Sequence, residues 1–199
     1  LYANRVQNVV NRVNTVDSDS VLNRIYSNVG TAQSLGLELG LELHPATWWK
    51  VFVGGNVYDY RIRGSFDNRP INTSTWVYSV NANTTFQLGK AWSLQGTLNY
   101  ISQRVTAQGV DSRFLAPNLT LRKGWMDNRL VATLQWLYLD MGLLPSNEQR
   151  ITTWRRGEFY TTTNYVYEVD MVMLNLSYQF NQLKSNPRFI KSEFGEREF

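Results

Sequence analysis

The sequence predicts an all-β fold: antiparallel transmembrane β-barrel strands, about eight in number. Three observations carry this prediction. Apolar residues recur at every second position in many separate segments, which is the period of a strand with two unlike faces. The connections between these segments alternate in length. No apolar run approaches the ~20 residues that a membrane-spanning helix needs, whereas ~10-residue alternating strands keep hydropathy low.

The composition narrows the function classes. The 199 residues are 43% hydrophobic, enough for one domain with a sizeable core. Without cysteine and with His44 as its single histidine, the chain has no disulfide framework and little means of building a metal cluster, and we expect no cofactor. The formal charge of +4 is dispersed among acidic residues, so we expect no nucleic-acid partner.

The opening segment is ambiguous. Its valines, at positions 6, 9, 10, 13 and 16, have helical spacing, but Val and Asn are poor helix formers and residues 17–20 form a turn signal. Counted as a strand, this segment brings the total to about eight.

The stretch SLGLELGLEL, residues 34–43, decides the first clear strand. Leu and Glu favour helices, but the leucines fall at every odd position from Leu35 to Leu43. A strand places all of them on one face and Glu38, Glu42 and His44 on the other.

Later segments repeat the alternation. A looser strand spans residues 49–60, and strands at 76–88 and 92–100 are close enough to form a hairpin. Further strands are expected at 115–121, 130–138 and 172–180. Pro117 conflicts with this pattern because it cannot donate to a ladder, so a bulge or a local end of pairing is expected there.

The connections near Pro45, Gly89 and Asp127 are short, whereas residues 64–75, 104–113 and 140–160 are expected to form longer polar loops. Outer-membrane barrels have this asymmetry, with tight periplasmic turns and longer outer loops.

The two faces of the strands differ in charge. The apolar positions carry no charged residue, whereas Glu38, Glu42 and Arg122 lie on the opposite face. A Lys or Arg at the lipid-facing midplane costs roughly 2–4 kcal/mol, so the apolar face is expected to meet lipid. Aromatic residues near both strand ends suit interfacial belts: Trp48, Trp49, Trp92, Trp125 and Phe180 at short turns, and Trp76, Tyr78, Trp136 and Tyr138 toward long loops.

Three segments resemble the TonB-dependent receptors of the bacterial outer membrane, in their outer-membrane β-barrel subgroup. Residues 28–39 resemble an N-x-G-x-x-x-S-x-G-x-E-L barrel strand, residues 123–130 with Asp140 resemble the penultimate hairpin, and residues 174–180 resemble the last strand. The tail at 191–199 resembles the acidic, Phe-terminated extension of that subgroup.

The resemblance implies a bacterial outer-membrane location and the last part of a barrel of about 22 strands. It also implies that the opening segment is a strand. Residues 1–180 would form the barrel segment and residues 181–199 a periplasmic extension. The implied function is uptake of a scarce nutrient such as an iron chelate, cobalamin or a glycan. The implied partners are outer-membrane lipid, the barrel assembly machinery, the plug domain and upstream strands of the same receptor, and TonB through the missing N-terminal part.

Candidate site residues follow from these faces. Glu38, Glu42, His44 and Arg122 are lumen-facing candidates, although a solvated or salt-bridged interior explains them as well. Tyr178 and Phe180 resemble the terminal signal read by the assembly machinery. The outer-loop candidates, a basic aromatic patch suited to anionic ligands or merely to solubility, are Trp154, Arg155 and Arg156.

Two other classes stay open. One is a stand-alone eight-stranded outer-membrane barrel acting as an anchor, adhesin or structural protein. The other is a soluble ligand-binding barrel of the lipocalin type. We expect no enzymatic activity, because no nucleophile or metal set accompanies the glutamates. The sequence begins at Leu1 without methionine or signal peptide, so we expect a processed or partial chain.

Overall fold

The computed structural model describes residues 1–17, 21–142, 148–167 and 170–180, and the regular elements there are all strands. No helix in these residues is long and apolar enough to span a bilayer. The strands are β1 (Tyr2–Val6), β2 (Val10–Asp17), β3 (Val21–Asn28), β4 (Thr31–Ala46), β5 (Trp49–Phe66), β6 (Arg69–Leu88), β7 (Trp92–Ile101), β8 (Arg104–Val105), β9 (Gly109–Asp111), β10 (Phe114–Trp125), β11 (Leu130–Leu137), β12 (Glu148–Arg155), β13 (Phe159–Val166) and β14 (Met171–Tyr178).

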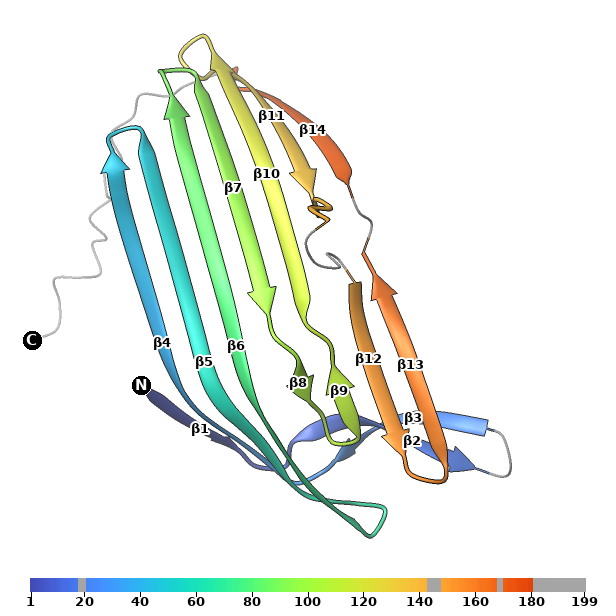
Figure 1. Cartoon of the computed structure of the whole chain (residues 1–199). Helices are drawn as coiled ribbons and strands as arrows, with labels where there is room; N and C mark the ends of the chain where they lie inside the picture. The colour runs from blue at the N-terminus through green and yellow to red at the C-terminus, as the bar shows by residue number, and fades with distance from the viewer. Residues whose placement is uncertain (18–20, 143–147, 168–169, 181–199) are drawn as a thin grey trace, which may run out of the picture.

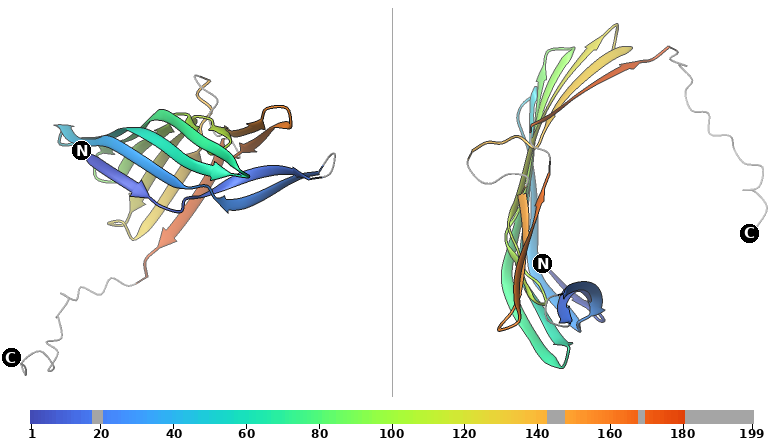
Figure 2. Two further views of the ribbon diagram at one scale, coloured as in Figure 1. Left: turned by 90° about the horizontal axis from the view of Figure 1, so that it is seen from below. Right: turned by 90° about the vertical axis from the view of Figure 1, so that its right-hand side faces the viewer.

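The main sheet has eight strands in the order β1-β4-β5-β6-β7-β10-β11-β14, and every pair in it is antiparallel. It forms a curved wall rather than a closed cylinder (Figures 1 and 2). The two edge strands are β1 and β14, and neither pairs with the other. The predicted all-β class with about eight principal strands is confirmed.

The connections define two ends of the wall. At the turn end, residues 47–48, 89–91 and 126–129 join neighbouring strands. At the loop end lie the longer connections, which themselves fold: β2 and β3 form a hairpin between β1 and β4, and the small sheet β13-β12-β9-β8 continues the wall (Figure 1). The expected asymmetry between short turns and long connections is therefore present in three of the four loop-end connections; the fourth, between β5 and β6, is short.

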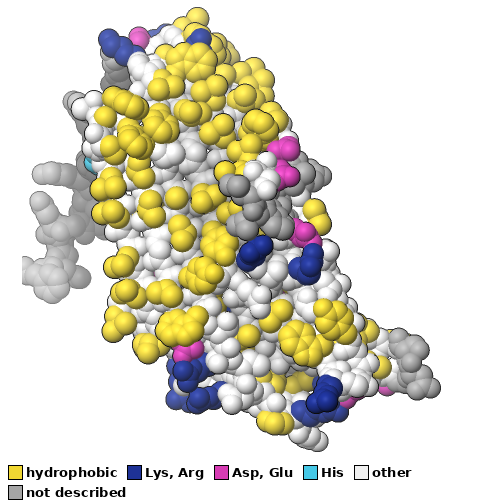
Figure 3. All heavy atoms as spheres, in the orientation of Figure 1, with side chains coloured by type: hydrophobic (Ala, Val, Ile, Leu, Met, Phe, Trp, Pro, Cys, Tyr) yellow, Lys and Arg dark blue, Asp and Glu magenta, His cyan; other side chains and the backbone are white. Residues whose placement is uncertain are grey.

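Residues that pair across neighbouring strands form rows, and these rows alternate between apolar and mostly polar side chains. The row Leu41–Val53–Ala82–Leu98–Pro117 is apolar from β4 to β10, and the next row toward the turn end, Glu42–Phe52–Asn83–Thr97–Asn118, is mostly polar. We call the side of the sheet with the first row the outward face. It is the convex side, and Figure 3 shows apolar side chains spread over it. Leu39 (65% exposed) and Leu174 (65%) lie in this surface, so the predicted apolar face is exposed at these positions, whereas Leu115 and Pro117 on the same face of β10 are buried.

The apolar and polar faces exchange places near the loop end. Beyond Leu35, the buried apolar residues point to the concave side, where the β2–β3 hairpin crosses the wall (Figure 2). Val13 and Val29 from the hairpin segment pack there against Ile62 and Ile71, and the first three are fully buried. This small core holds the hairpin on the wall. Its buried members are Val13, Val29, Ile62, Ile71 and Ala107.

The predicted loop at residues 64–75 is wrong. β5 runs on to Phe66 and β6 begins at Arg69, so the connection is the pair Asp67 and Asn68. Both residues have positive φ, 54° and 56°, which is the conformation of a tight hairpin turn that matches strand twist. Asp and Asn tolerate this conformation better than other side chains.

The two other expected loops and the opening segment are more structured than predicted. Residues 104–113 contain β8 and β9, and residues 140–160 contain β12 and the start of β13. The opening segment is a strand, as the resemblance implied, but most of it is β2, which pairs with β3 outside the main sheet. The eighth strand of the wall is β1, and β3 is a strand that the sequence pattern did not predict.

Pro117 lies where a ladder ends. The β10–β11 pairing begins at the next residue, Asn118, and the Pro117 carbonyl accepts a hydrogen bond from Leu139 N at 3.0 Å. Because β11 ends at Leu137, the ladder needs no backbone donor at Pro117, and the missing N–H of the proline costs no strand hydrogen bond. The expected local end of pairing explains this proline.

Candidate functional site

A polar hollow of about 360 Å³ lies between the hairpin and the wall at the loop end. Segments far apart in the sequence meet there because the hairpin folds back over β5 and the small sheet. Its charged and aromatic lining side chains are Arg12, Tyr26, Tyr60, Arg104 and Asp111. We call it the hairpin hollow.

Arg104 and Asp111 form the charged centre of the hairpin hollow. Arg104 Nη2 lies 3.0 Å from Asp111 Oδ2, and the Asp111 side chain is only 13% exposed. Burial lowers the pKa of Arg104, but the hydrogen bond and charge of Asp111 outweigh it and raise that pKa above its usual value. The Arg104 guanidinium also lies 6.0 Å from the centre of the Tyr60 ring. Arg104 therefore stays charged at physiological pH.

Hydrogen bonds fix the hairpin over the hollow. The Gln108 side chain bonds both backbone groups of Asn14: Oε1 accepts from Asn14 N at 2.7 Å, and Nε2 donates to Asn14 O at 3.1 Å. The Asn14 side chain, 2% exposed, donates to Thr153 Oγ1 at 2.6 Å. At the hairpin surface, Arg12 donates to Tyr165 and Arg24 to Thr163. The hairpin is therefore bound to β12, β13 and the β8–β9 turn.

The lumen-facing candidates lie elsewhere. Glu38 and Glu42 occupy the same side of β4 as buried Ala32, which is the concave side, and Arg122 shares a cross-strand row with Ser93 on that side. His44 Nε2 is 3.1 Å from Glu42 Oε1, and both side chains are more than half exposed. The structure brings His44 and Glu42 together but places neither of them in the hairpin hollow.

The outer-loop candidates have unlike surroundings. Arg155 is 10% exposed and bonds Asp67 and Glu158, both at 3.0 Å, while its guanidinium lies 5.7 Å from the centre of the Phe66 ring. It joins the β5–β6 turn to the β12–β13 turn. Trp154 is 45% exposed and Arg156 is also exposed, so these two stay available for a ligand.

The two candidates for the assembly signal are adjacent. The rings of Tyr178 and Phe180 meet edge to face with centres 4.7 Å apart, and Tyr178 pairs with Leu130 at the turn end. The predicted extension at 181–199 lies outside the described residues.

The hairpin hollow was missed by sequence reasoning because its residues come from five separate segments. One signal was present: Arg104 and Asp111 bracket a short segment with Gly109, and opposite charges opposed across a hairpin form an ion pair. No group of three or more His, Asp or Glu side chains in the described part of the chain is placed to hold a metal ion. The hollow is equipped to bind polar groups through guanidinium, carboxylate and phenol.

The open antiparallel wall, with its exposed apolar face and polar concave face, defines a barrel-wall protein. Residues 1–178 match the model of the outer membrane protein beta-barrel family, and the chain belongs to that family. Membership implies a location in the bacterial outer membrane. Searches of curated proteins and of solved structures found no match to the chain.

Proposed function

We propose that this chain is the C-terminal barrel portion of a TonB-dependent outer-membrane transporter, which takes up a scarce nutrient such as an iron chelate, cobalamin or a glycan. The turn end is then periplasmic and the loop end extracellular. The assembly machinery inserts the barrel, and a plug domain and upstream strands of the same receptor complete it. TonB engages the receptor outside this segment.

The observation that carries the proposal is the hairpin on the concave face. An eight-stranded barrel is just wide enough for its own side chains or one small ligand. A hairpin stacked on a sheet adds a layer about 10 Å thick. The β2–β3 hairpin packs against Ile62 and Ile71 as such a layer, which suits a wider cylinder.

The unpaired edges of the sheet also support the transporter proposal. Backbone groups that face lipid without partners cost several kcal/mol each, so membrane barrels close completely. β4 pairs with β1 only from Ala32 to Gly36, so its groups from Leu37 onward lack a partner on that side among the described residues. Further strands of a larger receptor would satisfy them.

One observation favours the stand-alone alternative, an anchor, adhesin or structural protein. The main sheet has eight strands, which is the number in the smallest outer-membrane barrels. Such a barrel would need β1 to pair directly with β14 and the hairpin to leave the interior.

The experiment is the intact mass of the protein extracted from its native membrane and identified by peptides of this sequence. A mass several-fold above the 23.1 kDa of this chain supports the transporter. A mass near 23.1 kDa, without a second chain supplying strands, overturns it in favour of the small barrel.

A further inference from the structure

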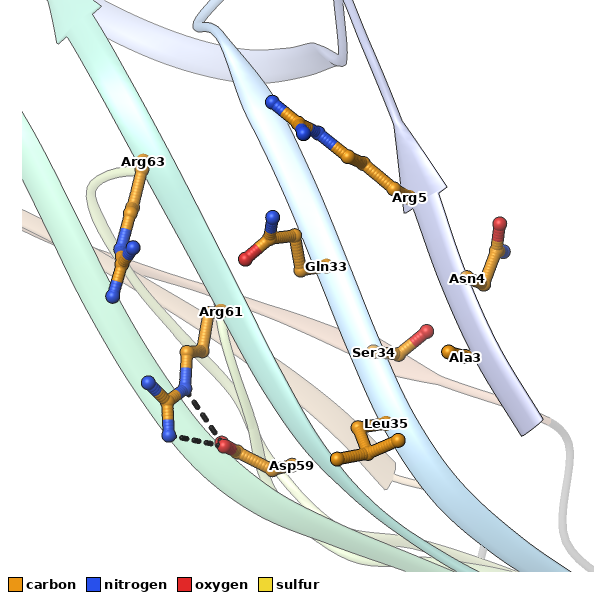
Figure 4. A pocket seen from close by; sticks show the side chains of 9 residues that line it. All are labelled: Ala3, Asn4, Arg5, Gln33, Ser34, Leu35, Asp59, Arg61 and Arg63. Carbon is orange, nitrogen blue, oxygen red and sulfur yellow. Dashed lines mark hydrogen bonds and ion pairs between the residues drawn. The ribbon is translucent and has the colours of Figure 1, made fainter. Parts of the chain in front are cut away.

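Three arginines lie together on the outward face where its apolar band ends. Two of them share one cross-strand row: Arg5 of β1 is opposite Gln33 of β4, and Gln33 is opposite Arg61 of β5. Arg63 lies two residues further along β5. We call Arg5, Arg61 and Arg63 the rim arginines. They surround an open hollow of about 460 Å³ (Figure 4).

The rim arginines face outward rather than toward the lumen. The alternate residues Ala32 and Ile62 are buried under the hairpin on the concave side. Since neighbouring residues of a strand point to opposite faces, Gln33, Arg61 and Arg63 must project from the convex side. The buried cluster behind them prevents these charges from turning inward.

Their depth matches a lipid head group. Outward apolar residues run from Leu43 to Leu35, about 27 Å along the strand at 3.4 Å per residue. At the strand tilt of roughly 35–45° this length covers about 19–22 Å of membrane thickness, which is most of the ~25 Å apolar band of an outer-membrane barrel. The last outward row of this band holds Leu35, Asp59 and Trp76. Asp59 is the first charge at this edge, and the next outward row holds Arg5 and Arg61, so the positive charges begin just beyond the apolar band, at the depth of the head groups.

The positive charge of this rim is not neutralised by the protein. Asp59 accepts a hydrogen bond from Arg61 Nε at 2.7 Å. Arg5 and Arg63 have no ion pair or side-chain hydrogen bond with any residue that the structure describes. The hollow is lined by three arginines and this single carboxylate, leaving an excess of two positive charges.

The spacing suits one or two phosphate groups. Two strand spacings separate Arg5 from Arg61, about 10 Å, and two residues separate Arg61 from Arg63, about 7 Å. Guanidinium groups bind phosphate oxygens through paired N–H donors. Long arginine side chains can converge on an anion lying between them.

We propose that the rim arginines bind the phosphate groups of lipids in the outer leaflet of the membrane, with the acyl chains lying along the Leu35 and Trp76 side of the apolar band. The partner is a phosphate-bearing lipid, not a free anion, because the cluster adjoins an exposed apolar surface. The proposal holds for the transporter and for the stand-alone barrel alike.

The test uses the whole protein as purified from its membrane, in detergent micelles, with two probes of identical acyl composition: monophosphorylated lipid A and its phosphatase-treated form. The variant is R5Q/R63Q, which removes the two arginines without an acidic partner. The control is R24Q/R150Q, which removes the same charge from β3 and β12 at the same end of the molecule. Electrophoretic heat-modifiability verifies that each variant is folded.

We expect R5Q/R63Q to bind the phosphorylated lipid roughly tenfold or more weakly, because each basic residue near anionic head groups contributes measurably. The control should bind as the unchanged protein does, and the dephosphorylated lipid should not distinguish the three proteins. Added salt should weaken the binding of the phosphorylated lipid only.

Equal binding of the phosphorylated lipid by R5Q/R63Q and the unchanged protein would overturn the proposal. An equal loss in R24Q/R150Q would also overturn it, because the effect would then be one of net charge. Displacement of the lipid by inorganic phosphate at equal concentration would identify a free-anion site and refute the lipid assignment.

Discussion

At the scale of the residue, Asn14 makes the contact on which the hairpin depends. It is a polar side chain, 2% exposed, and its amide reaches Thr153 while Gln108 takes both of its backbone groups. A buried polar group without its partner costs about 1–3 kcal/mol. The hairpin is thus held by a buried hydrogen-bond network as well as by Val13.

Substitution of Asn14 by Ala should loosen the hairpin without unfolding the wall. The change leaves the nearly buried Thr153 hydroxyl unpaired, which should cost about 1–3 kcal/mol. Hydrogen exchange of the β2 and β3 amides should accelerate roughly tenfold or more, while β5 and β6 are unchanged. Asn23→Ala, an exposed site on the same hairpin, is the control; faster exchange in both variants would show that the buried bond is not the cause.

At the scale of the element, the alternation predicted the wall because lipid imposes a uniform outward surface. Residues 34–43, 76–88, 92–100 and 172–180 follow it, and all lie in strands except Gln179 and Phe180, which come after the end of β14. The rule fails beyond Leu35, since there the outward face carries Arg61 and Arg63 while Ile62 and Ile71 pack inward. Because the apolar side chains change faces here, the sequence pattern of residues 64–75 predicted a loop instead of two strands. The hairpin hollow was also hidden, because it depends on a hairpin crossing that no local pattern encodes.

The crossing of the hairpin segment over β5 requires glycine at two positions. A Cβ on Gly64 would lie 1.8 Å from the Val29 carbonyl oxygen, and one on Gly30, whose φ is +120°, would lie 2.3 Å from the Arg63 carbonyl oxygen. These are backbone contacts, so a side chain cannot simply rotate away. The two segments touch directly, and this contact sets how closely the hairpin approaches the wall.

Gly64→Ala should therefore lower the yield of folded protein and its stability to urea. Overpacking typically costs about 1–3 kcal/mol, and here rigid backbone opposes the added methyl group. Gly55→Ala is the matched control on the same strand, because a Cβ there meets nothing within 4 Å. Equal urea midpoints for the two variants would refute the close-contact explanation.

The contact between the β5–β6 and β12–β13 turns should depend on pH. A hydrogen bond from Arg155 is the main cause that holds the pKa of Glu158 below its usual value; desolvation opposes it, and Arg69 adds a second bond. A carboxylate with a lowered folded-state pKa contributes stability above the unfolded pKa, about 4.5, and loses it as the pH falls through the lower folded value. The turns should therefore separate only as the pH falls below about 4.5.

Because the chain has no cysteine, paired spin labels at Ser65→Cys and Tyr160→Cys can report this separation. A narrow distance distribution at pH 7 should broaden at pH 3.5. Glu158→Gln should broaden it already at pH 7. A narrow distribution in Glu158→Gln at pH 7 would mean that Arg155 and Asp67 hold the turns without Glu158.

At the scale of the whole molecule, the wall presents two edges to its surroundings. The outer side of β1 and the outer side of β14 have no ladder partner in the described structure. In water such edges can be hydrated, but in hydrocarbon their N–H and C=O groups stay unsatisfied. A transporter segment and a stand-alone barrel therefore differ in what happens when these 199 residues fold alone.

The isolated chain, refolded in detergent, should not form a closed barrel if it is a segment of a larger cylinder. We expect no heat-modifiable band on electrophoresis, fast amide exchange along β1 and β14, and slow exchange in central β5 and β6, whose ladders are paired on both sides. Cysteines introduced at Tyr2→Cys and Ser177→Cys test closure directly. Residues 2 and 177 lie on the two opposite edge strands and are not cross-strand partners, so crosslinking should fail in the isolated chain. Efficient crosslinking together with slow exchange at both edges would mean that β1 pairs with β14, and the transporter assignment would give way to the small barrel.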